Sequence, residues 1–171
     1  VEPRPMGNEN MTAAPSGTFT TADGLLNIAA NKQEQFITLC GLIGRPELAE
    51  DPRFAERETR KKNRAALKAL IEEALARKTA AEWEREFNRA GVPAGRVLSI
   101  PQVLAEEQVR SRALTTEFEN VPGMNRPLTV VRGGFLVNGQ PPLPAAPPPA
   151  LGEHMEEVFE ELPNARERAY E

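Results

Sequence analysis

The stretch GRPELAEDPRFAERETRKKNRAALKALIEEALARKTAAEWEREFNRAGVPAGRV, residues 44–97, decides the fold because turn, capping and helix signals follow one another in it without a break. From about residue 58 to 77, apolar residues recur at intervals of three and four, which predicts an amphipathic helix. Thr79 and Glu82 form a capping box that begins a second helix, and Gly91 ends it. The same stretch contains no metal cluster, no phosphate loop and no evident nucleophile.

The residues before this stretch predict a hairpin and two further helices. The spans 18–21 and 25–30 have the composition of strands, and Asp23-Gly24 between them is a strong turn signal. Asn31 is placed to cap a helix whose apolar residues again recur at helical spacing. A short helix over 46–50 follows, since a proline at its start suits a first helical turn.

The residues after this stretch change in character. Ser99 and Gln102 form a capping box for a helix to about residue 110. The spans 114–119 and 128–137 are strand-like, and six prolines then crowd the segment 141–149, which predicts a stiff, extended connector. Residues 152–162 predict a final amphipathic helix.

These elements give the α+β class. We expect a small antiparallel sheet with several amphipathic helices, followed by a proline-rich connector and a C-terminal helix. The predicted organisation is an N-terminal loop or linker over 1–17, a compact domain over 18–112 and a C-terminal arm over 113–171. The arm comprises the two later strands, the connector and the last helix.

Charge and composition exclude several classes of function. The net charge of −4 argues against a broad basic face for nucleic acid. No apolar run is long enough to span a membrane, so no membrane association is expected. The single cysteine fits a reducing compartment, and the expected location is cytoplasmic. The opening residues carry no initiator methionine, and they read as the middle of a longer protein.

Few residues are candidates for chemistry. A metal site needs clustered ligands, and one histidine with one cysteine do not provide them. A catalytic triad would have to use His154, which is interpreted as structural or solvated. Cys40 lies on an apolar helix stripe and is interpreted as core. Asp23 and Asp51 each have a local turn role, so no catalytic residue is assigned.

Two segments remain as binding candidates. The basic run Arg57, Arg60, Lys61, Lys62 and Arg64 could meet an anion, but the preferred interpretation is a solvated face balanced by neighbouring glutamates. The loop MGNENMTAAPSG, residues 6–17, has small residues that let a ligand approach the backbone closely. It lacks the lysine of a phosphate-binding P-loop.

Taken in order, several short motifs are more specific together than apart. They are PRPMGN, the pattern AP-x-G-x-F-x-T-x-DG, LCGLIGRPELAEDPRFA, EWEREFNRAGVPAGRV, LTV and APPPALGEHMEEVFEEL. This series closely resembles the class III CoA transferases, the formyl-CoA and carnitine-CoA transferase family, from about residue 3 to residue 162. The chain resembles only the small domain and the C-terminal segment of that family.

The resemblance implies a two-domain enzyme that moves CoA from an acyl-CoA to a carboxylic acid. An aspartate of a large, Rossmann-like domain attacks the thioester in such enzymes, and no counterpart of that domain is expected here. A glycine-rich loop closes over the aspartate, and the matching positions are Gly7, Asn8, Glu9, Asn10, Met11 and Thr12. These six residues are therefore the candidate substrate-binding residues, although the glycine run itself is absent.

The resemblance and the residues together leave three hypotheses. The first is a fragment or split part of a class III CoA transferase, inactive alone, with coenzyme A as ligand or substrate and a separate large-domain subunit as partner. The second is a non-enzymatic interaction module that forms a homodimer, in which the arm is exchanged between copies. The third is a small binding protein for CoA or another anion, through the loop and the basic run.

Overall fold

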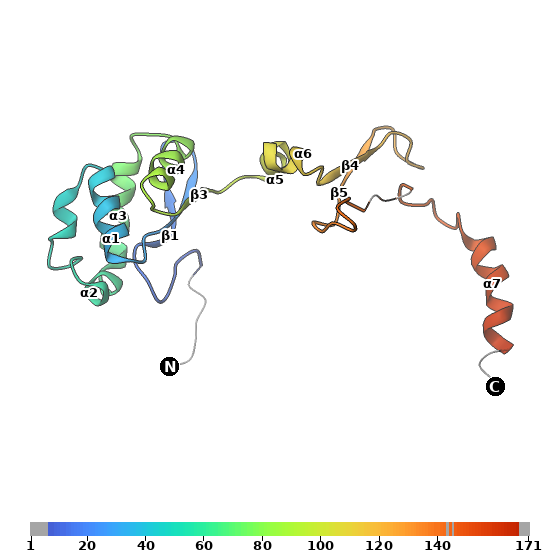
Figure 1. The fold of residues 1–171 in the computed structure, drawn as a ribbon, viewed down its shortest axis with the longest axis horizontal. Coiled ribbons are helices and arrows are strands. Elements are labelled where there is room, and N and C mark those ends of the chain that lie inside the picture. The colour runs from blue at the N-terminus through green and yellow to red at the C-terminus, as the bar shows by residue number, and fades with distance from the viewer. Residues whose placement is uncertain (1–6, 143, 145, 168–171) are drawn as a thin grey trace. The chain divides into compact units, whose positions relative to one another are not determined.

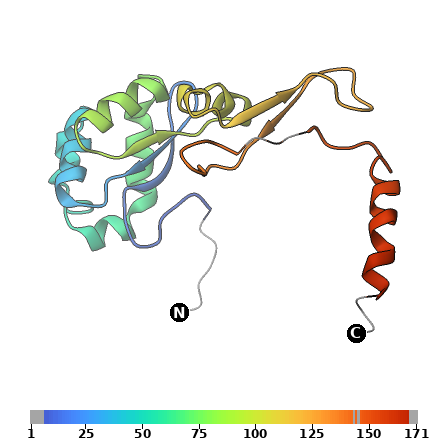
Figure 2. The ribbon, with the colours of Figure 1, turned by 45° about the vertical axis from the view of Figure 1, so that its right-hand side comes forward.

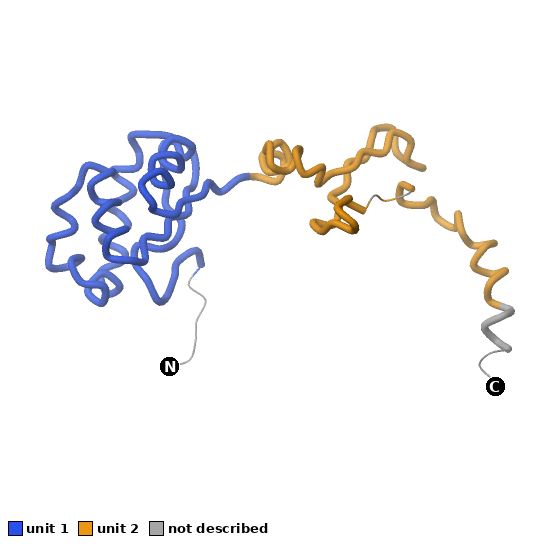
Figure 3. The backbone as a smooth tube through the Cα atoms, in the orientation of Figure 1, with its two compact units in different colours: residues 1–98 blue, residues 99–171 orange. Residues whose placement is uncertain are grey.

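The computed structural model describes residues 7–142, 144 and 146–167, and it divides into two compact units after Leu98 (Figure 3). Both units contain helices and a small antiparallel sheet, so the fold is α+β as predicted. The division lies before the segment 99–112, which the sequence pattern places in the first domain. That segment leads directly into the sheet of the second unit, because the amide of Leu114 donates to the carbonyl of Val109 (2.9 Å).

The sheet of the first unit has three strands in the order β1-β2-β3. Strands β1 (Ser16–Thr20) and β2 (Leu25–Ala29) form the predicted hairpin, and β3 (Ala94–Arg96) adds to the other edge of β2. Both pairings are antiparallel. Leu26 and Ile28 alternate with exposed neighbours along β2 and are buried, as expected of a strand with one face on the core.

The helices of the first unit pack against this sheet and against one another (Figures 1 and 2). They are α1 (Gln33–Leu42), the 3-10 helix η1 (Pro46–Ala49), α2 (Arg57–Lys62), α3 (Arg64–Leu75) and α4 (Ala80–Arg89). Helix α3 packs against β1, and α4 packs against β2, β3 and α1. The capping box predicted for α4 is present, with the Thr79 amide donating to Glu82 Oε2 (2.9 Å).

An apolar cluster of described residues forms the core of the first unit. Its buried members are Phe19, Leu26, Ile28, Ala30, Phe36, Leu39, Cys40, Ile43, Leu48, Phe54, Leu67, Ile71, Ala74, Leu75, Trp83, Phe87 and Val92. Trp83 stacks on Phe87, with ring centroids 5.2 Å apart. The indole Nε1 of Trp83 donates to the carbonyl of Leu75 (2.8 Å), so the polar group of this buried side chain is satisfied.

Two predicted helices are each divided in the structure. The helix expected over 58–77 breaks at Asn63, whose backbone has φ −103° and ψ 21°. The Asn63 side chain donates to the carbonyl of Thr59 (3.0 Å), so it competes for a helical acceptor. The helix expected to reach residue 110 breaks at Glu106, where ψ is 142°.

The start of α1 also differs from the prediction. Lys32, rather than Asn31, is the N-cap residue, with φ −87° and ψ 154°. Its amide donates to the side-chain oxygen of Gln35 (3.1 Å), the third residue of the helix, where a capping box has a glutamate or glutamine. The apolar residues of the helix therefore face the core as predicted, with the boundary moved by one residue.

In the described part of the second unit there are a two-stranded sheet and three helices. They are α5 (Ile100–Ala105), α6 (Glu107–Ser111), β4 (Thr115–Phe118), β5 (Leu128–Val131) and α7 (Met155–Glu167). Strand β5 ends before the Gly133-Gly134 pair instead of continuing to residue 137, because glycine weakens a strand. The described residues of the proline-rich connector form neither helix nor strand.

Candidate functional site

The predicted substrate loop folds back along the first strand of the sheet. The amide of Thr18 donates to the carbonyl of Asn8 (3.2 Å), and the amide of Asn10 donates to the carbonyl of Ser16 (3.1 Å). Within the loop, Asn10 Oδ1 accepts from both the amide (2.8 Å) and the hydroxyl (2.9 Å) of Thr12. The loop is therefore an ordered extension of the sheet edge.

One glycine makes this approach possible. Gly17 has φ +150°, and a Cβ atom placed on it would lie 2.6 Å from the carbonyl oxygen of Asn8. A side chain at this position would push the loop away from β1. The loop backbone also forms an isolated antiparallel bridge between Glu9 and Gly17.

Two arginines of the basic run hold the loop by its carbonyl oxygens. Arg57 Nη2 donates to the carbonyl of Thr12 (3.2 Å). Arg64 donates through Nη1 to the carbonyl of Asn10 (2.7 Å) and through Nη2 to that of Met11 (3.2 Å). Three successive loop carbonyls thus bind guanidinium groups from α2 and α3.

Arg60 anchors the base of the loop from inside the protein. Its side chain is 1% exposed, and its Nε donates to the carbonyl of Ala14 (3.0 Å). Its Nη1 donates to Gln33 Oε1 (2.8 Å) and to the carbonyl of Phe54 (2.9 Å). The guanidinium also lies 4.2 Å from the ring centroid of Phe36. Burial lowers the pKa of Arg60 below its usual range, although arginine remains charged.

The interpretation of the basic run as a solvated face is therefore wrong for Arg60 and incomplete for Arg57 and Arg64, which are exposed or partly exposed and also bind the loop. Arg60 is buried, and Arg57 and Arg64 bind the loop. The sequence feature that could have indicated this is the spacing of three and four residues between the arginines, which is typical of one side of a helix, although the structure divides them between α2 and α3. Lys61, by contrast, pairs with Glu58 (2.8 Å) in the exposed manner expected.

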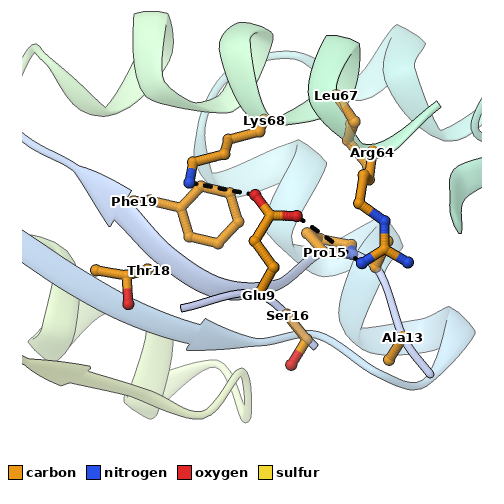
Figure 4. Close-up of a pocket in the computed structure, with 10 residues that line it drawn as sticks. Glu9, Ala13, Pro15, Ser16, Thr18, Phe19, Arg64, Leu67 and Lys68 are labelled. Atoms are coloured by element: carbon orange, nitrogen blue, oxygen red, sulfur yellow. Dashed lines mark hydrogen bonds and ion pairs between the residues drawn. The ribbon is translucent and has the colours of Figure 1, made fainter. Parts of the chain in front are cut away.

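A small pocket lies between the loop, β1 and α3 (Figure 4). It is lined by Glu9, Ala13, Ala14, Pro15, Ser16, Thr18, Phe19, Arg64, Leu67 and Lys68. Glu9 points toward α3, where its carboxylate lies 3.8 Å from Arg64 Nη1 and 3.4 Å from Lys68 Nζ. The other candidate residues, Gly7, Asn8, Asn10, Met11 and Thr12, are exposed at the rim of the loop.

The residues weighed for catalysis have structural or exposed positions. Cys40 is buried in the core, and burial raises the pKa of its thiol to about 12. His154 is exposed in the turn before α7. Asp23 Oδ1 accepts from the amide of Ala80 at the start of α4 (2.7 Å). These positions give each residue a place in the fold and assign none of them to catalysis.

Asp51 is likewise held locally. Its carboxylate accepts from the amide of Arg53 (2.9 Å) and pairs with the guanidinium of the same residue (2.6 Å). These hydrogen bonds lower the pKa of Asp51 below its usual range. Among the described residues there is no group of histidine, cysteine and carboxylate side chains that could hold a metal ion, and no helix is long and apolar enough to cross a membrane.

Comparisons with known proteins agree on one family. Residues 1–155 match the model of CoA-transferase family III. The chain is 34% identical over 128 residues to an acetyl-CoA:oxalate CoA-transferase of Acetobacter aceti, covering 75% of this chain and 33% of that protein. It is 29% identical to a succinyl-CoA:glutarate CoA-transferase of Mus musculus, covering 99% of this chain and 38% of that protein.

Solved structures show the same likeness. A CAIB/BAIF family protein from Brucella suis superposes with a TM-score of 0.80 at 31% identity, over 95% of this chain and 41% of that one. Rv3272 of Mycobacterium tuberculosis superposes with a TM-score of 0.69 at 37% identity, over 83% and 39%. The chain thus spans between about a third and two fifths of these relatives. It belongs to CoA-transferase family III.

Proposed function

We propose that this chain supplies the loop-bearing part of a CoA transferase, and that it does not transfer CoA without a large domain that carries the nucleophile. The observation that carries the proposal is the position of the two aspartates. Asp23 accepts from the amide of Ala80 at the start of α4 and Asp51 pairs with Arg53, so neither is free to attack a thioester. The family's chemistry calls for such a carboxylate.

The reaction explains why a separate nucleophile is needed. A carboxylate oxygen attacks the carbonyl carbon of the acyl-CoA thioester, the carbon–sulfur bond breaks, and CoA leaves as thiolate. The resulting anhydride is attacked by the CoA thiolate at the aspartyl carbonyl, which releases the first acid. The second acid then repeats these steps in reverse and leaves as its CoA thioester. Each step is an ordinary acyl transfer.

The loop around Glu9 supports a role beside the reacting acyl group. Its rim residues Asn8, Met11 and Thr12 are exposed, while its backbone is held by Arg57 and Arg64. Such a segment can present small polar groups and one flexible methionine to a ligand without losing its own shape. The relatives named above act on oxalate and glutarate, so a carboxylic acid acceptor is the substrate class proposed here.

The C-terminal helix supports a docking role. Met155, Val158, Phe159 and Leu162 recur at helical spacing along α7, and each is about half exposed, from 46% to 61%. An unpartnered apolar stripe of this kind is a place for another protein surface. We assign it to the large-domain part of a family III enzyme, and to a second copy of this chain when that part is absent.

The test is reconstitution of CoA transfer. The chain is assayed alone and mixed with the separately expressed remainder of the Brucella suis relative, using acyl-CoA donors and carboxylic acid acceptors. Mass spectrometry of the CoA esters reports transfer. We expect none from either part alone and measurable transfer from the mixture. Transfer by this chain alone would refute the proposal.

A matched control identifies the contribution of the loop. The mixture is repeated with Arg64→Met, which removes two loop contacts, and with Lys62→Met, which changes an exposed neighbouring cation. If the loop lies beside the acyl group, the first variant lowers transfer and the second leaves it unchanged. Equal CoA transfer by the Arg64→Met and Lys62→Met mixtures would show that the loop does not act beside the acyl group.

A further inference from the structure

The pocket beneath the loop contains more positive than negative charge. Arg64 and Lys68 lie one turn apart on α3 and both face into it, and Glu9 is the carboxylate between them (Figure 4). Arg60 adds a buried guanidinium close by, hydrogen-bonded to neutral oxygens at Ala14 and Gln33. This arrangement favours an anion in the position of the Glu9 carboxylate.

Glu9 holds that position loosely. Its Oε2 atom lies 3.8 Å from Arg64 Nη1, beyond hydrogen-bonding distance, and its Oε1 atom lies 3.4 Å from Lys68 Nζ, at the long limit. The two nitrogens of Arg64 instead make shorter contacts to the carbonyls of Asn10 and Met11. The ion pairs of Glu9 are therefore weak, and they are open to exchange with a competing carboxylate.

The loop does not depend on the Glu9 side chain for its shape. Its backbone is fixed at Glu9 by the bridge to Gly17, and farther along by hydrogen bonds from Arg57 and Arg64 to loop carbonyls. The carboxylate can thus swing outward by side-chain rotation while the backbone stays in place. Rotation of this kind is fast and costs little in a side chain that is 29% exposed.

The size of the pocket restricts what can replace Glu9. The space beside it is about 20 Å³, room for about one water molecule. When the glutamate carboxylate leaves, the vacated volume fits another planar carboxylate better than a tetrahedral, doubly charged phosphate. Phe19 and Leu67 form apolar walls, and Lys68 Nζ lies 5.8 Å from the ring centroid of Phe19.

We propose that this pocket is a carboxylate site that Glu9 fills in the free protein, and that the distal carboxylate of a dicarboxylic acid takes the place of Glu9 between Arg64 and Lys68. The assignment of this acid as the acceptor in CoA transfer rests on the function proposed above. Binding itself does not, because all the residues involved belong to this chain. The proposal predicts that Glu9 competes with the ligand.

Nuclear magnetic resonance titration of the whole chain tests the competition. The probe is glutarate, with sodium chloride at equal ionic strength and pentane-1,5-diol as controls. Wild type is compared with Glu9→Gln, Glu9→Gln/Lys68→Met and the exposed-site control Glu9→Gln/Lys62→Met. Chemical shifts of the Ser16, Phe19 and Lys68 amides report the pocket, and Trp83 fluorescence reports that each variant is folded.

Glu9→Gln removes the competing carboxylate, so the apparent Kd for glutarate is expected to fall by about tenfold, which corresponds to about 1.4 kcal/mol. The further change Lys68→Met should abolish saturable shifts, and Lys62→Met should not. Equal affinity of wild type and Glu9→Gln, or the same shifts with sodium chloride, would overturn the inference.

The titration and the reconstitution assay can fail independently. If glutarate binds this pocket but the reconstituted mixture transfers no CoA, the inference stands and the proposed function fails. Transfer without glutarate binding would overturn the inference and leave the proposed function in place.

Discussion

At the scale of single residues, Arg60 is expected to contribute strongly to stability. It is 1% exposed and donates to Ala14, Gln33 and Phe54. We expect Arg60→Met to destabilise the first unit by about 3–5 kcal/mol, because the buried carbonyls of Ala14 and Phe54 each lose a hydrogen bond to a charged donor, worth about 1.5–3 kcal/mol. Urea unfolding followed by Trp83 fluorescence measures this.

Two variants make the result specific. Arg60→Lys keeps the charge but lacks the planar set of donors, so it should recover only part of the loss. Lys62→Met on the exposed side should change stability by less than about 0.5 kcal/mol. A loss below about 1 kcal/mol for Arg60→Met would contradict the assigned role.

The reactivity of Cys40 is a second residue-scale prediction. The pKa of its thiol is raised to about 12 by burial, so only about 10⁻⁴ of it is thiolate at pH 8. We expect labelling by a disulfide reagent to be slow in the folded chain and rapid in urea. The chain has one cysteine, so each labelled molecule reports this site. Rapid labelling without denaturant would place the thiol outside the core.

The same shift predicts the sign of a pH effect. The folded-state pKa of this acid lies above its unfolded value, so burial of the neutral thiol stabilises the fold fully below about pH 9. That stabilisation is lost as pH rises from about 9 to about 12, because the unfolded state releases the proton first. Cys40→Ala should therefore show a weaker loss of stability over this range.

At the scale of elements, the loop and the α2–α3 pair depend on one another. We expect Arg64→Met to raise hydrogen exchange in peptides covering residues 8–16 by about 10- to 100-fold, because hydrogen bonds to charged donors contribute about 1.5–3 kcal/mol. Arg57→Met, which removes one contact, should have a smaller effect. Mass spectrometry after deuteration measures both. Unchanged exchange in Arg64→Met would show that the sheet edge and the other arginines hold the loop without Arg64.

Local sequence patterns predicted which helices and strands form, but they did not predict where a helix breaks. The hairpin, the Thr79 capping box and the apolar faces of the helices follow from spacing and turn chemistry. The break at Asn63 depends on its side chain reaching the carbonyls of Thr59 and Arg53. A polar residue in an amphipathic pattern gives no sign of that contact, since asparagine is also tolerated on a solvated helix face.

At the scale of the whole molecule, the candidate site is a long-range structure. The arginines and the loop carbonyls that they bind lie 45 to 54 residues apart in the sequence. Loop and basic run were each visible as segments, but periodicity describes only neighbours within a few turns. Their pairing, and the inward direction of Glu9, needed the folded chain. The family motifs predicted which residues form the loop but not what holds it.

The apolar core of the first unit predicts that this unit folds without the second. The apolar cluster around Trp83 belongs entirely to residues 1–98. We expect this fragment to fold alone and to unfold in urea with the same midpoint as the full chain. Trp83 fluorescence follows both transitions. If the free energy of unfolding of the fragment is lower than that of the full chain by more than about 1 kcal/mol, the second unit stabilises the first.

The apolar stripe of α7 predicts the state of association of the isolated chain. Met155, Val158, Phe159 and Leu162 are already about half buried, so covering the rest of each side chain contributes about 0.7–1.5 kcal/mol, or about 6–12 kcal/mol for the eight side chains of two copies. Pairing two copies costs about 4–15 kcal/mol of lost freedom. These opposing magnitudes give a weak homodimer that forms only at high concentration. Sedimentation equilibrium over a range of concentrations should therefore show a mass that rises from monomer toward dimer.

The stripe and the opposite face of α7 can be separated by substitution. Val158→Glu with Phe159→Glu places charges where the copies meet, so this variant should remain monomeric at every concentration. Glu157→Gln changes a charge outside the apolar stripe and should leave the association intact. The fragment 1–98 lacks the helix and should also be monomeric. If the double variant associates as wild type does, α7 is not the contact, and its apolar residues are left for the large-domain part alone.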